Sequence, residues 1–241
     1  MSYFDTLIFE KTDGIAYITL NRPSVLNVYN TLMRDELYQV LSAIRDDNEI
    51  RSVVLKGAGE RAFCAGADLS EFLTAPSPTI ARQVRWERDV WGLFLSCPRP
   101  IIAALHGYVL GDGIEMALCC DIRIAADDAK FGLPEMGLGI IPAAGGTQTL
   151  PRAVGRARAL EMICMGNRIS AKEALAIGLV NRVVPNTDLY PTANAMANQI
   201  ACFNPVVVSD IKQAIKRGLE LSITDGLKME RLMAQKLLWN I

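Results

Sequence analysis

The chain has 241 residues, of which 51% are hydrophobic, and its 25 Lys and Arg residues nearly balance its 26 Asp and Glu residues, for a formal net charge of −1. This length and apolar content are sufficient for a single domain with a substantial core. The balanced charge gives no support to nucleic acid or another polyanion as a partner.

Cysteine and histidine usage narrows the chemistry further. The six cysteines include no CxxC pair and two are adjacent, Cys119 and Cys120, which disfavours a disulfide framework. Without a signal-like stretch at the N-terminus, we expect a reduced, cytoplasmic protein. Because His106 is the only histidine, a His-rich zinc site is excluded, and we predict no metal site. His106 lies in an apolar stretch just before Gly107, which favours a structural role over that of a catalytic base.

The longest apolar run, residues 101–120, is not typical of a membrane span. It contains His106, Asp112, Glu115 and three glycines, a combination that a transmembrane helix does not easily tolerate. We therefore expect no membrane partner.

The first part of the chain alternates strands with helices. A β-hairpin is predicted over 7–20, with its turn at 12–14. Apolar residues at helical spacing predict an amphipathic helix over 31–47. A short buried strand is expected over 52–56.

A second helix is expected to start at Ser77, with Pro78 in its first turn. The stretch 74–77 is rich in proline and small polar residues and is interpreted as a mobile cover. Three arginines give this helix a mildly basic face, interpreted as solvated or attracted to phosphate: Arg82, Arg85 and Arg88.

The central stretch alternates apolar segments with glycine turns. Residues 101–110 are predicted to form one buried strand with Gly107 inside it, and a turn at 111–113 leads to a short helix over 114–120. A strand around 121–126, a loop over 131–135 stiffened by Pro134, and a helix start at 145–146 follow.

The last part of the chain is predicted to be mainly helical. Ser170 and Glu173 form a capping box that starts one helix, and Gly178 is expected at its C-terminal end. The other expected elements are a helix over 156–165, a strand over 179–184, a helix that opens at Asn204-Pro205, and an amphipathic helix from 224 onward. The alternation indicates an α/β architecture with right-handed crossovers.

Two acids of the central stretch, Glu115 and Glu135, have apolar residues or glycines as neighbours. Ionised carboxylates are costly to bury, so such residues must be paired, hydrogen-bonded or used in chemistry. Glu115 falls in the first turn of the helix predicted over 114–120, where backbone N–H groups and the helix dipole suit a developing oxyanion. Taken singly, Glu115 also fits a structural acid at a helix N-terminus, and Glu135 an acceptor of hydrogen bonds from its own loop.

Five segments carry a resemblance to a known family: NRPSVLN (21–27), RAFCAGADL (61–69), HGYVLGDGIEMALCCDIRIA (106–125), FGLPEMGLGIIPAAGGTQTLPRAVG (131–155) and RISAKEALAIGLVNRVVP (168–185). In order and spacing they resemble the crotonase superfamily, the enoyl-CoA hydratases and isomerases. The resemblance implies an α/β fold, a crotonase-like spiral of repeated ββα units with C-terminal helices.

The resemblance also implies an organisation. Residues 1–185 are expected to form the spiral core that carries an acyl-CoA site, and residues 186–241 a helical region for packing and oligomerisation. A homotrimer or hexamer is implied. Family members generally continue past this last helix, so we expect either a truncated C-terminus or a pocket that closes differently.

Carried over position by position, the resemblance implies roles for individual residues. The backbone N–H groups of Ala67 and Asp112 fall where the family forms an oxyanion hole for the thioester carbonyl. Glu115 falls on the glutamate that is given the water, and Glu135 on the one that delivers the proton. The other residues expected to contact the acyl-CoA are Val25, Leu26, Ala65, Gly66, Asp68, Leu69, Leu110, Gly111, Pro134 and Gly139.

The implied reaction is addition of water to trans-2-enoyl-CoA to give 3-hydroxyacyl-CoA. Coenzyme A is part of the substrate, and no metal or redox cofactor is expected. Negative charge develops on the thioester oxygen during the addition, so two aimed N–H donors lower the barrier. Partial burial raises carboxylate pKa values and makes proton exchange practical near neutrality.

Hydratases of the family usually carry glycine at two positions where this chain has Asp112 and Ala143. The Asp112 carboxylate is interpreted as a cap for the helix that follows; if it faced the thioester, it would oppose the developing charge and raise the pKa of Glu115. Ala143 adds a methyl group beside the expected water. An enoyl- or dienoyl-CoA isomerase, an acyl-CoA hydrolase and a catalytically weak CoA-binding scaffold therefore stay as alternatives, whereas RNA binding has no support from the charge.

Overall fold

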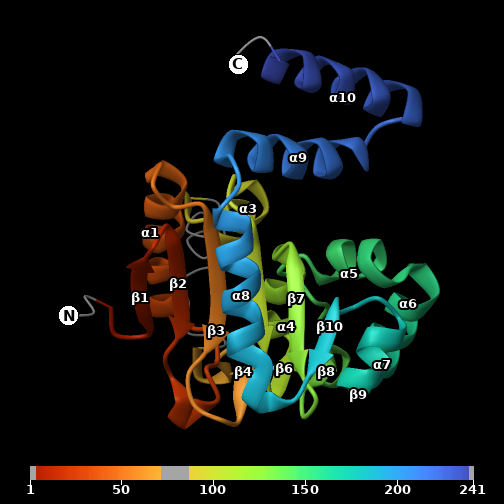
Figure 1. Cartoon of the computed structure of the whole chain (residues 1–241). Helices are drawn as coiled ribbons and strands as arrows, with labels where there is room; N and C mark the ends of the chain where they lie inside the picture. The colour runs from red at the N-terminus through yellow and green to blue at the C-terminus, as the bar shows by residue number, and fades with distance from the viewer. Residues whose placement is uncertain (1–3, 72–86, 239–241) are drawn as a thin grey trace.

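The computed structural model describes residues 4–71 and 87–238 and contains two β-sheets flanked by helices (Figure 1). The larger sheet has the strand order β1-β2-β3-β5-β7-β10, and the smaller one the order β4-β6-β8-β9. This is the predicted α/β class. The helix start expected at Ser77-Pro78, the cover over 74–77, and Arg82 and Arg85 lie outside the described residues.

The larger sheet begins with the predicted hairpin. β1 (Leu7–Thr12) pairs antiparallel with β2 (Ile15–Leu20), and Asp13 and Gly14 turn the chain with φ angles of 52° and 77°. The strands that join β2 in parallel are β3 (Ser52–Gly57), β5 (Ile101–Leu105), β7 (Ile122–Ala126) and β10 (Arg182–Val184). Their sequences are mostly apolar because a parallel sheet with helices on its faces is buried on both sides.

Each turn of the chain gives one strand to each sheet. β4 (Ala62–Cys64), β6 (Tyr108–Leu110) and β8 (Lys130–Gly132) follow β3, β5 and β7, and they pair in parallel in that order. β9 (Ile169–Ser170) adds antiparallel to β8. The repeated unit is a strand of the larger sheet, a strand of the smaller sheet and a helical segment, which is the predicted ββα spiral.

The stretch 101–110 forms two strands, and the prediction of a single strand is wrong. The chain leaves the larger sheet after Leu105 and enters the smaller one at Tyr108, with Gly107 at the bend at a φ of 55°. A Cβ at Gly107 would lie 2.1 Å from the carbonyl oxygen of Arg61, so only glycine fits there. Both strands are buried, and the apolar pattern therefore does not reveal the break.

Strand residues alternate between two cores on the two faces of the larger sheet. Val53 and Leu55 of β3 pack in one core with α1 (Thr31–Asp46), whereas Val54 faces the other core. α1 matches the helix predicted over 31–47, and the Asn30 side chain caps its first turn. The period-2 pattern of a strand thus gives both cores their apolar side chains.

The second core is covered by α8 (Leu189–Ala201), a helix that the sequence analysis missed. Its buried face consists of Leu189 and three alanines at a four-residue spacing: Ala193, Ala197 and Ala201. Alanine is small, so the helix lies close to the strands, and Figure 1 shows α8 running along the sheet. A stripe of alanines gives only a weak amphipathic signal, which explains the omission.

The remaining helices follow most of the predicted boundaries. The Ser170–Glu173 capping box is present at the start of α7, and Asn204 caps α9. The segment predicted as a loop over 131–135 instead begins in β8 and ends in η3. The bounds are α3 (Val90–Ser96), α4 (Asp112–Cys119), α5 (Gly146–Val154), α6 (Arg156–Met165), α7 (Ala171–Ala176), α9 (Pro205–Gly218), α10 (Ile223–Leu238), η1 (Pro23–Val25), η2 (Leu69–Glu71), η3 (Pro134–Leu138) and η4 (Asn186–Asp188).

The last two helices, α9 and α10, pack against each other at one end of the molecule (Figure 1). Lys212 of α9 is 9% exposed, and its ammonium donates to the Asp121 carboxylate at 2.6 Å and to the Arg99 carbonyl at 2.8 Å. This partly buried ion pair ties α9 to the spiral. No helix within 4–71 or 87–238 is long and apolar enough to cross a membrane.

His106 lies between β5 and β6 and is 2% exposed, and within the described ranges neither ring nitrogen has a hydrogen-bond partner. Its ring meets that of Tyr190 edge to face, with centroids 6.3 Å apart. Burial lowers the pKa of His106, and the charge of Asp128 and the nearby backbone of Gly59 oppose this only in part. Burial therefore favours the neutral form of the imidazole in the folded protein.

We expect the buried neutral His106 to make the protein less stable in acid. Its folded pKa is below its unfolded value of about 6.5, so the unfolded state binds the proton first, and stability falls as the pH drops below that value. H106F keeps a ring without a titrating nitrogen. The free energy of unfolding of H106F and of wild type is measured with urea from pH 7.5 to 5.5, about one unit either side of 6.5. As the pH falls, the value for H106F should rise relative to that for wild type by up to about 1.4 kcal/mol per pH unit. A difference that does not change with pH would contradict this account.

Candidate active site

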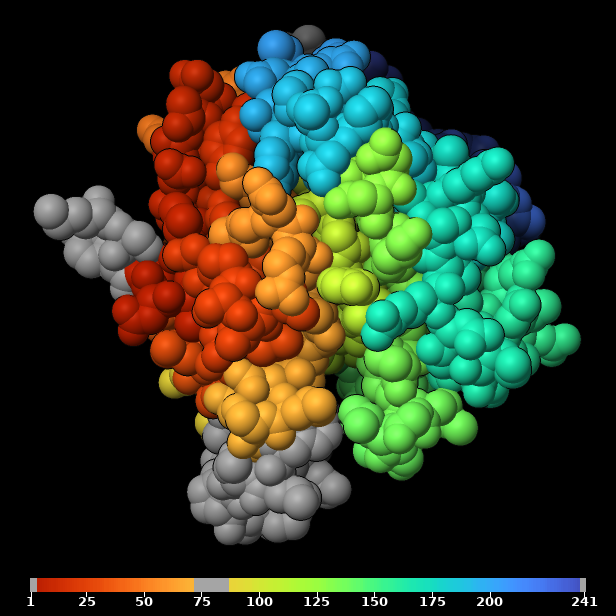
Figure 2. Space-filling model, turned by 90° about the horizontal axis from the view of Figure 1, so that it is seen from below, coloured from red at the N-terminus to blue at the C-terminus, as the bar shows by residue number. Residues whose placement is uncertain are grey.

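The loops that carry the predicted site residues leave one edge of the smaller sheet. β4, β6 and β8 are parallel neighbours, so their carboxyl ends lie at the same edge. Residues 65–69 follow β4, residues 111–115 follow β6, and residues 133–135 follow β8. Figure 2 views the molecule from below, with the segment around β4 in orange and the segment after β8 in green.

Glu115 is the most buried acid of this edge, with 1% of its surface exposed. It lies in the first turn of α4, as predicted. Its Oε1 atom accepts the backbone N–H of Ala144 at 2.9 Å and that of Gly146 at 2.7 Å. These two donors satisfy a carboxylate that would otherwise be costly to bury.

The glycines at 145–146, which were predicted to start a helix, explain how α5 comes so close to the Glu115 carboxylate. Gly145 is the N-cap of α5 with a φ of 105°, in the left-handed region that favours glycine. A Cβ at Gly146 would lie 2.8 Å from Glu115 Oε1 and 2.9 Å from the Cβ of Pro142. The N-terminus of α5 therefore reaches the carboxylate because Gly146 lacks a side chain, while Gly145 allows the left-handed backbone of the N-cap.

The pKa of Glu115 is raised to about 7, first by burial and then by the negative charge of Asp112. The hydrogen bonds from Gly146 and Ala144 act in the opposite direction, and a hydrogen bond with the Asp112 side chain raises the pKa further. A carboxyl group with this pKa exchanges protons readily near neutral pH.

Asp112 is not the helix cap, and that interpretation of its carboxylate is wrong. Gly111 occupies the N-cap position, and Asp112 is the first residue of α4. Residues three apart share one face of a helix, so the Asp112 carboxyl is directed to Glu115.

Glu135 approaches the same place from η3 and is half-buried. A Cβ on Gly111 would lie 3.0 Å from its Oε1 atom, and within the described residues its buried Oε2 atom has no hydrogen-bond partner. Burial raises the pKa of Glu135, and the charge of Glu115 adds to this effect. The two predicted acids therefore interact, with Gly111 beside one of them.

Ala67 lies in an extended segment beside Tyr29. The N–H of Tyr29 donates to Gly66, and its carbonyl accepts from Asp68. Ala67 lies between Gly66 and Asp68, and in a parallel bridge of this kind its N–H points away from the segment of Tyr29. Within 4–71 and 87–238, no acceptor for the Ala67 N–H is found.

The backbones of the two predicted oxyanion segments are in contact. A Cβ on Gly111 would lie 3.3 Å from the Cα of Gly66, and a Cβ on Gly66 would lie 3.4 Å from the carbonyl oxygen of Leu110. The first-turn N–H groups of α4, among them that of Asp112, follow directly. Glycine at both positions brings the segments of Ala67 and Asp112 together.

An ion pair holds the segment after β4 in place. Arg22 donates to the Asp68 carboxylate at 2.9 Å and to the carbonyl of Val28. Hydrogen bonds from Ser70 and then from Arg22 lower the pKa of Asp68. The two exposed predicted residues of these segments, Val25 at 44% and Leu69 at 58%, leave apolar surface open to solvent.

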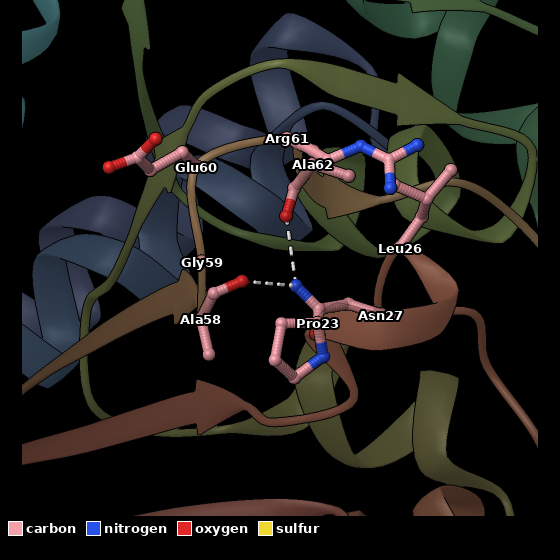
Figure 3. Close-up of a pocket in the computed structure, with 8 residues that line it drawn as sticks. All are labelled: Pro23, Leu26, Asn27, Ala58, Gly59, Glu60, Arg61 and Ala62. Atoms are coloured by element: carbon pink, nitrogen blue, oxygen red, sulfur yellow. Dashed lines mark hydrogen bonds between the residues drawn. The ribbon is translucent and has the colours of Figure 1, made fainter.

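A pocket of ≈ 310 Å³ lies beside the loop from β3 to β4 (Figure 3). The Asn27 side chain donates to the carbonyls of Ala58 and Ala62, which fixes its wall, and Glu60 points away from its centre. Leu26, a predicted acyl-CoA contact, lines it too. Glu115 and Glu135 do not line this pocket.

Two of the predicted contacts lie at the margin of the acid cluster. Pro134 and Gly139 are exposed at the ends of η3, and nothing lies within 4 Å of a Cβ built on Gly139. Within the part of the chain that the structure describes, no group of three or more His, Cys, Asp or Glu side chains is arranged to hold a metal ion.

Comparison with known proteins identifies the family. A family model described as enoyl-CoA hydratase/isomerase matches residues 10–239. The chain belongs to this family. Its crotonase fold is shared with the crystal structure of an enoyl-CoA hydratase from Bacillus anthracis, with a TM-score of 0.92 and 40% identity, covering 97% of this chain and 91% of that chain.

Curated relatives in the enoyl-CoA hydratase/isomerase family are of similar length. A short-chain-enoyl-CoA hydratase of Clostridium acetobutylicum is 42% identical over 226 residues, which is 94% of this chain and 87% of the relative. A crotonyl-CoA hydratase of Syntrophomonas wolfei is 37% identical over 228 residues, again 94% of this chain and 87% of the relative.

In this family member, sequence reasoning missed the groups that hold Glu115. The donors are backbone N–H groups of Ala144 and Gly146, which carry no residue-type signal. The glycine pair at 145–146 was a visible signal of close approach, and it was assigned only to a helix start. The contact between Asp112 and Glu115 was available from their three-residue spacing.

We expect G146A to destabilise the protein, because its methyl group would collide with the Glu115 carboxylate and with Pro142. Overpacking of this kind costs about 1–3 kcal/mol, measured as the loss in the free energy of unfolding by urea. G137A is the matched control, since nothing lies within 4 Å of a Cβ at that position of η3. Equal stability of G146A and wild type would show that α5 does not approach Glu115 as described.

Proposed function

We propose that the protein is an enoyl-CoA hydratase that adds water to trans-2-enoyl-CoA to give 3-hydroxyacyl-CoA. The observation that carries the proposal is that a buried acid, Glu115, and a half-buried acid, Glu135, meet two glycine-bearing backbone segments at one edge of the smaller sheet. The names of the curated relatives support the same reaction.

In the proposed reaction, the thioester carbonyl accepts the backbone N–H groups of Ala67 and Asp112. Negative charge moves to this oxygen as water attacks the β-carbon, and fixed N–H dipoles stabilise it without reorganisation. One N–H donor of this kind contributes about 3–4 kcal/mol to lowering the barrier. The N-terminus of α4 adds its dipole to the same position.

The two acids handle the protons. Glu115 accepts a proton from the attacking water while the new C–O bond forms, and Glu135 donates its proton to the α-carbon. Proton transfer from Glu115 back to Glu135 then restores both groups, so the net change is the addition of one water. Raised pKa values fit both roles, because Glu135 must hold a proton and Glu115 must exchange one near neutrality.

We expect E115Q and E135Q each to lower kcat for hydration of crotonyl-CoA by about 10²–10⁴-fold, the usual contribution of a general acid or base. The assay follows the loss of absorbance of the conjugated thioester. KM should change much less, because neither acid supplies the main binding contacts of the CoA. E161Q is the control, since Glu161 is exposed on α6 and pairs with Arg158. Turnover that survives in the double variant E115Q/E135Q would refute these roles.

Other substrates and readouts separate the alternatives. An isomerase would convert a 3-enoyl-CoA to the 2-enoyl-CoA faster than it hydrates crotonyl-CoA, and the third acid of the site, Asp112, keeps this possibility open. A hydrolase would release free CoA thiol. Tight acyl-CoA binding in calorimetry with no turnover would select a CoA-binding scaffold.

We infer further that the protein forms a homotrimer or hexamer through its C-terminal helices. In support, none of the described residues of α10 is buried in the single chain. Large apolar side chains are exposed on α9 and α10: Val206, Ile211, Ile215, Ile223, Leu227, Leu232 and Leu238. Exposed apolar surface of this extent is typical of an interface.

A further inference from the structure

The Ala67 N–H lies in a short connecting segment between β4 and η2. A hydrogen-bond donor that stabilises a developing charge must be held firmly, because its contribution depends on its distance and direction. The backbone hydrogen bonds of Tyr29 tie the residues on either side of Ala67 to a turn formed by residues 22–29, the template turn. The Ala65 N–H adds another bond, to the Leu26 carbonyl at 3.1 Å. The Ala67 segment therefore follows the backbone of the template turn.

The template turn is strained and needs contacts to hold it. Leu26 and Asn27 have φ angles of 59° and 55°, in the left-handed region that a bulky side chain such as leucine rarely adopts. Such a conformation persists only where the surrounding structure fixes it. The buried Asn27 side chain donates to the carbonyls of Ala58 and Ala62 (Figure 3), and its oxygen accepts the backbone N–H of Arg22 at 2.8 Å. These bonds fix the turn against the start of β4.

The Arg22 side chain joins the template turn to the far end of the Ala67 segment. Its Nη1 atom donates to the Val28 carbonyl at 2.8 Å and to the Asp68 carboxylate at 2.9 Å. This ion pair is largely shielded from solvent, with 22% of the Arg22 side chain and 15% of the Asp68 side chain exposed. The other oxygen of Asp68 accepts the N–H and the hydroxyl of Ser70. One guanidinium group thus binds the residue directly after Ala67.

The position of this segment also sets its distance from the start of α4. Gly66 has a φ of 110°, and a Cβ built on it would lie 3.4 Å from the carbonyl oxygen of Leu110. The segment therefore lies between the template turn and the backbone that leads into α4. A shift of the segment away from the turn would change the geometry between the Ala67 N–H and the first-turn N–H groups of α4.

We infer that Arg22 is a positioning residue, which fixes the distance and direction of the Ala67 N–H through its bonds to Val28 and Asp68. The inference rests on the proposed function, in which this N–H holds the thioester oxygen. Arg22 acts through protein groups, so its loss should slow the chemical step and leave the binding of coenzyme A nearly unchanged.

The first test is the hydration of crotonyl-CoA by R22Q, R22K, D68N and the double variant R22Q/D68N. R22Q and D68N should each lower kcat by about 10²-fold, the cost of a small misplacement in an active site, with KM close to that of wild type. The double variant should be no slower than either single variant, because both changes break the same contact. R22K, which keeps a positive charge and a donor, should retain more activity than R22Q.

R45Q is the matched control, since Arg45 forms an exposed ion pair with Asp46 on α1, and its kcat should equal that of wild type. Urea unfolding shows which variants are folded, and D68N, which keeps the size of the side chain, carries the test if R22Q does not fold.

Three results of this assay would overturn the inference. The first is a kcat in folded R22Q and D68N that equals that of wild type. The second is a rise in KM alone, which would mean that Arg22 binds the substrate directly. The third is a change of kcat in opposite directions in R22Q and D68N, which would mean a purely electrostatic effect, because one variant loses a positive charge and the other a negative charge.

A bound chromophore separates this inference from the proposed function. The probe is a cinnamoyl-CoA with an amino group on its ring, because its absorbance moves to longer wavelength when the thioester carbonyl accepts hydrogen bonds, without any turnover. At saturation, the shift should be smaller in R22Q and D68N than in wild type and R45Q. If this pattern is found but wild type does not hydrate crotonyl-CoA, the proposed function fails and the positioning by Arg22 stands. An equal shift in wild type and the two variants, or no shift in wild type, would overturn the inference.

Discussion

The buried carboxylate of Glu115 depends on two backbone N–H groups at the start of α5, and the site is arranged around this contact. An acid that is 1% exposed must find donors inside the protein. Here the donors come from a helix N-terminus, which can approach because Gly146 carries no side chain and because Gly145 adopts a left-handed backbone at the N-cap. The requirement links α4 of one ββα turn to α5 of the next.

The spiral explains why segments far apart in the sequence meet at this contact. Each turn adds one strand to the smaller sheet, and its parallel strands end at the same edge. The loops after β4, β6 and β8 therefore converge, and Gly66 and Glu135 both lie close to Gly111: a Cβ on Gly111 would be 3.3 Å from the Cα of Gly66 and 3.0 Å from Oε1 of Glu135. Asp112 then lies in the first turn of α4 with Glu115, and burial, followed by the charge of Asp112, raises the pKa of that glutamate to about 7.

Much of the fold was predictable because periodicity and capping are local signals. The hairpin, α1 and the capping box of α7 follow from patterns within a few residues. The break at Gly107 was missed because its cause is the carbonyl of Arg61, which is distant in sequence, and α8 was missed because alanines give a weak stripe. The site residues were assigned by resemblance, and their catalytic roles stay predictions. The donors to Glu115 were not predictable, since any residue type has a backbone N–H.

The most direct test of the account is a crystal structure with a bound acyl-CoA thioester that cannot be hydrated. The account predicts that the thioester oxygen lies about 2.7–3.1 Å from the backbone nitrogens of Ala67 and Asp112. It also predicts that the β-carbon faces Glu115 and Glu135, with room for one water between them. A thioester carbonyl bound away from these two nitrogens, or an acyl chain that does not pass between the two acids, would contradict it.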